Sequence, residues 1–186
     1  MKRSFDIFSS IILLGTLALP LTFIAILILL TSKGPFLYWS RRIGKGNSVF
    51  YMPKFRTMML QAPEVATHLL KNPSSFYTPV GRFLRKYSID ELPQLYSILK
   101  GDMSVVGPRP ALHNQEDLIS LRTKSGVYLL KPGLTGLAQV SGRDKLSVQD
   151  KVEIDRRYLI RKSFLFDLYI IWLTVLKVSK RDGISH

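Results

Sequence analysis

Two adjacent carboxylates, Asp90 and Glu91, are the residues whose types and spacing most readily suggest chemistry. Ser88 and Glu91 have the spacing of a capping box, and Asp90 would complement the helix dipole, so the pattern also predicts an ordinary helix start. A helix start equally collects phosphates and keeps a nearby carboxylate ionised, and Arg85 lies one turn upstream. In that interpretation Asp90 would be a nucleophile or a Mg²⁺ ligand. The spacing leaves both interpretations open.

Two further segments offer groups that could hold a phosphate or a nucleotide. Arg109 lies between two prolines, which stiffen the loop and reduce the entropy that the guanidinium loses on binding phosphate. Residues 131–143 contain three glycines and would form a flexible loop whose backbone can approach a ligand closely. Thr135, Gln139 and Arg143 offer a hydroxyl, an amide and a guanidinium there. Each segment could equally be a turn with solvated side chains.

Several other kinds of chemistry find no support in the sequence. The histidines His68, His113 and His186 lack the spacing of metal ligands, and the chain has no cysteine for thiolate catalysis or a disulfide. The pattern Gly44-x-Gly46 is too weak for a dinucleotide-binding fingerprint, and there is no P-loop. No finger, RNA-recognition or basic-leucine pattern indicates nucleic-acid binding.

The charge balance predicts a polyanionic partner. The 186 residues include 27 Lys and Arg against 13 Asp and Glu, which gives a formal net charge of +14. This excess suits nucleic acid, acidic lipid or a phosphorylated substrate. Nearly all of it lies after Ser32 and is spread along the chain, which favours a domain with a positive surface or cleft over a polybasic tail.

The first 32 residues predict a membrane anchor. Residues 11–31 are almost wholly aliphatic and long enough to enter a bilayer, which takes about 20 apolar residues. The run exceeds the roughly 7–15 apolar residues of a signal peptide. Pro20, in its middle, predicts a kink or break. Basic residues on both flanks draw both ends toward the cytoplasm, which a helix that enters and returns would satisfy. A kinked spanning helix stays equally open.

The elements that must position these groups follow from the apolar pattern. Residues 36–39 and 49–55 are predicted as short strands around a turn at residues 44–47. Helices are predicted at residues 82–100, with Gly101 as the stop, and at 111–125, 148–161 and 163–180. The last helix is amphipathic and aromatic, which suits the interface of an anionic membrane or an ordinary core face. The predicted fold class is α/β or α+β, mainly helical with a few short strands.

Five motifs in order give the chain a resemblance to a known family. They are KFRTM at residues 54–58, SIDELPQL at 88–95, KGDMS at 100–104, GPRP at 107–110 and KPGLTGLAQVSGR at 131–143. With the broken apolar helix before them, they resemble the bacterial sugar transferases that are monotopic phosphoglycosyl transferases. The resemblance is to the small members, which consist of one membrane anchor and the catalytic core, and it covers nearly the whole chain.

This resemblance implies transfer of a sugar 1-phosphate from a UDP-sugar to a polyprenyl phosphate, undecaprenyl phosphate, with release of UMP. The order would be ping-pong, through a covalent aspartyl phosphosugar, as the first membrane step of bacterial glycoconjugate synthesis. Residues 1–32 would anchor the protein in the bacterial cytoplasmic membrane, and residues 33–186 would form a catalytic domain on its cytoplasmic face. The small members suggest an N-acetylated sugar. Whether the protein forms a homodimer stays open.

The resemblance also implies roles for single residues. Asp90 falls on the attacking aspartate, where Mg²⁺ would assist and could contact it, and Glu91 falls on its acidic partner. Pro20 matches the proline that breaks the anchor into a re-entrant helix. The positions that match family residues near phosphate, nucleotide or the active site are Lys54, Arg85, Arg109, Arg143 and Asp155.

Departures from the family pattern leave the acidic pair intact. Ser40 stands where the family often has Gln, Ser97 where it often has Asn, and Leu19 where Ser usually precedes the proline. Two other functions also suit the residues. A membrane-tethered binder of acidic lipid or nucleic acid would not need Asp90. A Mg²⁺-dependent hydrolase of nucleotide sugars would need it but would need no polyprenyl acceptor. As a transferase, the protein is expected to have no nucleic-acid partner.

Overall fold

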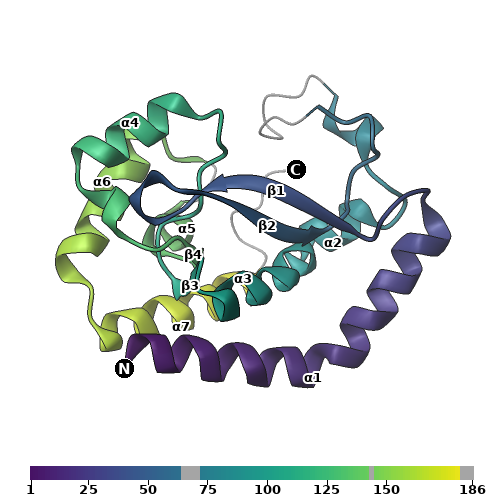
Figure 1. Cartoon of the computed structure of the whole chain (residues 1–186), viewed down its shortest axis with the longest axis horizontal. Helices are drawn as coiled ribbons and strands as arrows, with labels where there is room; N and C mark the ends of the chain where they lie inside the picture. The colour runs from purple at the N-terminus through teal and green to yellow at the C-terminus, as the bar shows by residue number, and fades with distance from the viewer. Residues whose placement is uncertain (64–71, 143–144, 181–186) are drawn as a thin grey trace.

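The computed structural model describes residues 1–63, 72–142 and 145–180, and it is mainly helical with two small sheets, as predicted (Figure 1). The elements in chain order are α1 (Lys2–Thr31), β1 (Leu37–Ile43), η1 (Lys45–Asn47), β2 (Val49–Phe55), η3 (Pro73–Phe76), α2 (Gly81–Lys86), η4 (Ile89–Gln94), α3 (Leu95–Lys100), β3 (Ser104–Val106), α4 (Glu116–Lys124), η5 (Val127–Leu129), β4 (Gly133–Thr135), α5 (Leu137–Ser141), α6 (Val148–Arg161) and α7 (Phe164–Lys180). The η elements are 3₁₀ helices.

The apolar helix α1 bends part-way along its length, so that its two limbs run in different directions (Figure 1). Pro20 lies inside this continuous helix, where it removes one backbone hydrogen bond and its ring crowds the carbonyl four residues earlier. The helix is long and apolar enough to cross a membrane, and almost none of its most apolar stretch is buried in the protein. α1 could therefore be associated with a membrane.

The N-terminal end of α1 is bound to the globular part of the protein by charged side chains. The buried Asp6 carboxylate accepts hydrogen bonds from Ser104 Oγ and from the Val105 N–H, each at 3.0 Å. The Lys2 ammonium pairs with the carboxylate of Asp167 in α7. The basic flank that the sequence offers as a membrane signal is thus also the attachment of α1 to the domain.

The C-terminal limb of α1 is bound to the same globular part by apolar contacts. Ile28 is fully buried and packs with Phe55 of β2 and Leu84 of α2. Both ends of α1 therefore lie against one domain, and the bent middle, which includes the 84 % exposed Leu19, points away from it (Figure 1).

The hairpin of β1 and β2 is antiparallel, as predicted, but β1 extends beyond the predicted residues 36–39 to Ile43. Gly46 in the connecting turn has a φ of +68°, which glycine adopts without strain. Phe50 and Met52 of β2 are buried on one face of the hairpin. They form a core cluster with Leu95, Ile98 and Met103.

The predicted single helix over residues 82–100 is wrong, because the chain forms α2, η4 and α3 in succession. Ser88 adopts a left-handed φ of +54°, which ends α2, and Pro93 lacks the N–H that a continuous helix would need. The capping box is not formed, since the Ser88 side chain makes no capping hydrogen bond. Gly101, with a φ of +102°, ends α3 as predicted.

The strands β3 and β4 form a short parallel pair that carries the loop of Arg109. Residues 131–142, predicted as a glycine loop, instead contain β4 and α5. The backbones of Gly107 and Gly133 approach so closely that a Cβ on Gly133 would lie 2.1 Å from the Gly107 nitrogen. A Cβ on Gly107 would lie 2.3 Å from the Lys131 carbonyl oxygen. No side chain fits at either position.

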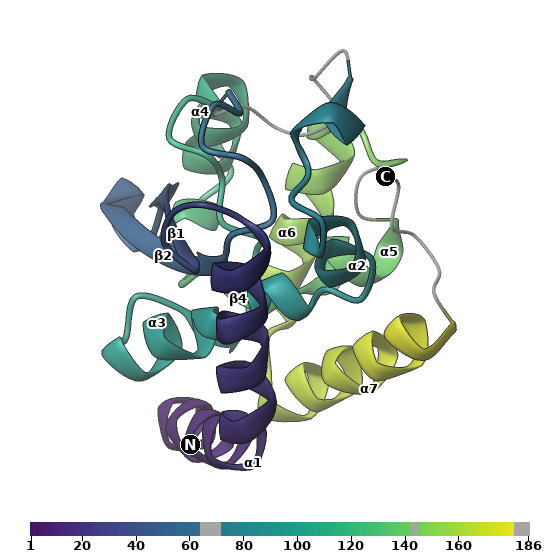
Figure 2. The ribbon, with the colours of Figure 1, turned by 90° about the vertical axis from the view of Figure 1, so that its right-hand side faces the viewer.

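The helix α7 lies along the same end of the molecule as the first limb of α1 (Figure 2). Its inner face is in the core, where Ile170 is fully buried, while Leu165, Trp172 and Val175 are mostly exposed. Tyr169 stacks on Trp172 with 6.0 Å between ring centroids. The helix thus has the core face and the exposed aromatic face that the sequence offered as alternatives.

We expect Gly133→Ala to lower the free energy of unfolding by at least about 3 kcal/mol, because its methyl group would meet backbone atoms that cannot rotate away. Gly15→Ala is the matched control, since a Cβ there meets nothing within 4 Å. Thermal unfolding of both variants in detergent measures the difference. Equal melting temperatures would contradict the close approach of β3 and β4.

Candidate active site

The acidic pair lies in η4, and both carboxylates are buried. Two other segments bring cations to them. β2 presents Lys54, and the loop after β3 presents Arg109. The structure therefore brings together four residues that the motifs assigned to the site, from three parts of the chain.

The Glu91 carboxylate is bound by two cations at once. Lys54 Nζ donates to Glu91 Oε1 at 3.0 Å. Arg109 donates from Nη2 to Oε1 at 2.7 Å and from Nη1 to Oε2 at 3.3 Å. Burial lowers the pKa of the Lys54 ammonium, and the charge of Glu91 acts against that shift. Glu91 thus fixes the Arg109 guanidinium in a two-pronged geometry that a lysine could not reproduce.

The Asp90 carboxylate differs from that of Glu91 in its hydrogen bonding. No hydrogen bond reaches it from the side chains of residues 1–63, 72–142 and 145–180. Burial raises the pKa of the Asp90 carboxyl, while Lys54, Arg85 and Arg109 act to lower it. Its oxygens are therefore available to a ligand, next to several positive charges.

The third cation, Arg85, stands at the end of α2. Its guanidinium carbon lies 5.5 Å from the centroid of the Tyr77 ring, a cation–π distance. Together with Lys54 and Arg109 it surrounds Asp90 with more positive than negative charge. Such a site can attract a phosphate group and offset its charge, which lets a carboxylate approach another anion.

Comparison with known proteins decides the family. A family model described as bacterial sugar transferase matches residues 1–181. The chain belongs to the bacterial sugar transferase family. The motifs around Asp90 and Arg109 had indicated this resemblance before the comparison.

Named relatives agree with that membership. Undecaprenyl-phosphate galactose phosphotransferase of Salmonella typhimurium is 38 % identical over 98 % of this chain, which spans only 41 % of that protein. The exopolysaccharide production protein ExoY of Sinorhizobium fredii is 38 % identical over 98 % of the chain and 87 % of its own length. The uncharacterized sugar transferase EpsL of Bacillus subtilis is 39 % identical over the whole chain and 91 % of its own length.

Two of the expected site residues of this sugar transferase are not seen at the acidic pair. Asp155 is fully buried in α6 and pairs with Arg122, whose Nη2 lies 2.7 Å from Asp155 Oδ2. Asp155 is also not among the groups that shift the pKa of Asp90. Arg143 lies outside the described residues. Sequence reasoning missed Arg122, because an arginine in a polar helix carries no local signal of a buried partner.

The donor groups of this site could hold Mg²⁺ through one carboxylate together with substrate phosphates. Among the described residues, no group of three acidic or histidine side chains could cage a metal ion. Mg²⁺ is commonly held by one or two carboxylates together with substrate phosphates. Asp90, which accepts no hydrogen bond from the described residues, suits that arrangement, whereas Glu91 already holds two cations.

We expect Asp90→Asn to leave the melting temperature of this sugar transferase unchanged or higher near pH 8. Because burial raises the pKa of Asp90, the folded protein holds that proton more tightly than the unfolded chain, so the ionised carboxylate opposes folding at higher pH. The difference in melting temperature between Asp90→Asn and the wild type should shrink as the pH falls toward the ordinary pKa of a carboxyl group. Thermal unfolding of the variant and the wild type between pH 5 and pH 8 measures it.

The exposed Asp117 of α4 supplies the control, since Asp117→Asn removes the same charge without relieving burial. A lower melting temperature for Asp90→Asn than for Asp117→Asn at pH 8 would contradict the unfavourable burial of Asp90.

Proposed function

We propose that this chain is a phosphoglycosyl transferase that moves a sugar 1-phosphate from a UDP-sugar to undecaprenyl phosphate and releases UMP. The observation that carries the proposal is the buried Asp90 carboxylate among Lys54, Arg85 and Arg109, in a chain of the bacterial sugar transferase family. This arrangement supplies a nucleophile and the positive charge that a diphosphate substrate needs. The product is a polyprenyl diphosphosugar for glycoconjugate synthesis.

The reaction proceeds in two displacements at phosphorus. An Asp90 oxygen attacks the phosphorus that carries the sugar, the anhydride bond to the nucleotide breaks, and UMP leaves with the bonding electron pair. The phosphate oxygen of the polyprenyl acceptor then attacks the aspartyl phosphosugar and frees the Asp90 carboxylate. Each step forms one phosphorus–oxygen bond and breaks one, so no oxidant or further reactant is needed.

The neighbouring residues stabilise charge in both displacements. Arg109, held by Glu91, and Lys54 would offset the negative charge of a diphosphate that approaches Asp90. Mg²⁺, held by Asp90 and the substrate phosphates, would neutralise charge on the diphosphate and its leaving group. Glu91 contributes by keeping the two cations in place, since removing it would leave two partly buried charges without their counter-ion.

The anchor places this site at the surface of a membrane. A helix that spans a bilayer has its ends on opposite sides of a core about 30 Å thick. Both ends of α1 are bound to one globular domain, which supports a helix that enters and returns at Pro20. The exposed aromatic side chains of α7 would suit the same interface. The catalytic domain then meets the acceptor phosphate at the cytoplasmic face while the polyprenyl tail stays in lipid.

We expect the purified protein to gain the mass of one sugar phosphate and to release UMP when it is incubated with Mg²⁺ and its UDP-sugar, without acceptor. A panel of UDP-sugars, read by intact-protein mass spectrometry, would also identify the sugar. Asp90→Asn should show no adduct and should lose turnover by at least about 1,000-fold.

Other outcomes would replace this proposal. UMP that appears only with acceptor, and without an adduct, would indicate direct transfer with Asp90 as a metal ligand. Free sugar phosphate without an acceptor product would indicate a hydrolase. Membrane binding without turnover for any sugar in the panel would favour a binding protein.

The topology of α1 can be tested separately, because the chain has no natural cysteine. We expect Ser4→Cys and Lys33→Cys, both at exposed positions, to react with a membrane-impermeant thiol reagent from the same side of inverted vesicles. Leu19→Cys, at the bend, should stay unlabelled from both sides. Labelling of the first two positions from opposite sides would show a spanning helix.

A further inference from the structure

The loop that carries Arg109 is held at every residue, and its first half is held by β4. Gly107 donates its N–H to the Thr135 carbonyl at 2.9 Å, and the Pro108 carbonyl accepts from the Gly133 N–H at 2.9 Å. These bonds continue the parallel pairing of β3 with β4. They fix the loop only as far as Pro108.

Two arginine side chains hold the second half of the loop. Arg122 Nη1 donates to the Arg109 carbonyl at 2.8 Å, and Arg42 Nη1 donates to the Pro110 carbonyl at 3.2 Å. The Arg42 Nε donates to Ser40 Oγ, the position where the family often has Gln. Two successive carbonyls are thus held by side chains from α4 and from β1.

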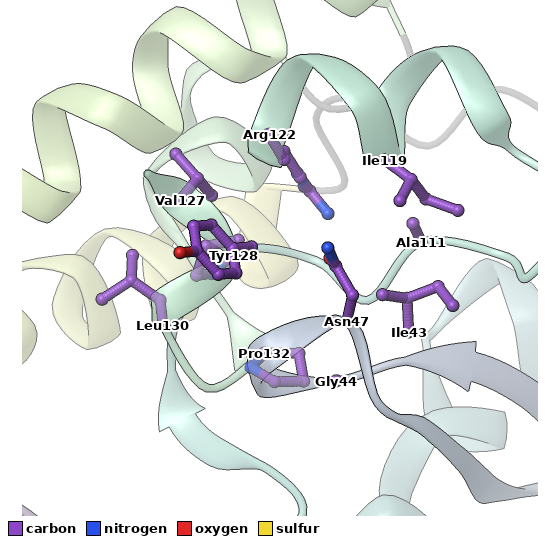
Figure 3. A pocket seen from close by; sticks show the side chains of 11 residues that line it. Ile43, Gly44, Asn47, Ala111, Ile119, Arg122, Val127, Tyr128, Leu130 and Pro132 are labelled. Carbon is purple, nitrogen blue, oxygen red and sulfur yellow. The ribbon is translucent and has the colours of Figure 1, made fainter. Parts of the chain in front are cut away.

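A small pocket lies behind the loop. The pocket is open to solvent and lies between the hairpin turn, α4 and η5, and Pro108 and Ala111 form part of its wall. Figure 3 shows Arg122 reaching from α4 into this pocket, opposite Asn47 of the hairpin turn. The hydrogen bond from Arg122 thus links α4 to the loop along the wall of this pocket.

The buried Asp155 sets the direction of the Arg122 guanidinium. Arg122 Nε and Nη2 both donate to Asp155 Oδ2, at 3.1 and 2.7 Å. Because the guanidinium is planar and its donors have a fixed geometry, binding two of its nitrogens directs the third toward the Arg109 carbonyl. A lysine could pair with Asp155, but it has a single nitrogen and no such fork.

We infer that Arg122, oriented by Asp155, is a positioning residue that fixes the Arg109 backbone so that its guanidinium holds Glu91 beside the reacting carboxylate. This inference rests on the proposed transferase activity. It also gives Asp155 a role that does not require contact with substrate.

The test compares Arg122→Lys with wild type in UMP release from the UDP-sugar, with polyprenyl phosphate present. The variant keeps the charge that neutralises Asp155, so its melting temperature should stay near that of wild type. Its kcat should fall by about 10- to 100-fold with a smaller change in KM, because a displaced loop weakens the transition state more than binding. The matched control is Arg157→Lys on α6, whose partner Glu153 is exposed, and it should change neither constant.

A double variant, Arg122→Gln with Asp155→Asn, separates positioning from folding. It removes both buried charges, so no lone charge remains to destabilise the protein. We expect a melting temperature near wild type and a kcat as low as that of Arg122→Lys. This variant also answers the question if Arg122→Lys does not fold.

Wild-type kcat in either folded variant would overturn the inference and leave the transferase proposal intact. A loss of kcat that follows the loss of melting temperature across the variants would also overturn it, since the pair would then serve folding alone. Wild-type protein that releases no UMP from any UDP-sugar would overturn the proposed function and this inference with it.

Discussion

The buried Glu91 carboxylate is the constraint on which the rest of the site depends. A buried charge is strongly destabilising unless cations and hydrogen bonds surround it, and Lys54 and Arg109 meet that requirement here. To do so, the hairpin, η4 and the proline-flanked loop must converge within hydrogen-bonding distance. The two small sheets and the close approach of Gly107 to Gly133 are the means by which they converge.

The apolar helix α1 and the globular part of the protein form one unit, which follows from where the polar residues of α1 lie. Asp6 is bound to Ser104 and Val105 of β3, the strand that leads into the Arg109 loop. α1 and the candidate site are thus connected through one strand. Arg56, the residue after β2, also donates to the Ser32 carbonyl at the end of α1, so the other end of this helix is attached to the domain as well.

Sequence patterns predicted the local elements well where one residue type dominates the choice, as at Pro20 and Gly101. They failed where backbone geometry departs from the pattern, since the left-handed Ser88 divides an otherwise helical stretch. The family motifs named the residues that the structure brings together at the acidic pair, and their roles stay predictions. Long-range pairs such as Arg122 with Asp155, which are 33 residues apart, depend on tertiary packing that no local spacing encodes.

The attachment of Lys2 to Asp167 also has a consequence for the time at which the fold can be completed. These partners are 165 residues apart, so the start of α1 leaves the ribosome long before its counter-ion is made. At typical synthesis rates of 5–20 residues per second, this interval is about 8 to 33 s. For that time the Lys2 ammonium lacks its partner on α7, although Phe55 and Leu84, which pack on the other limb of α1, have already been made. The docking of α1 on the domain is therefore completed only after α7 has been made.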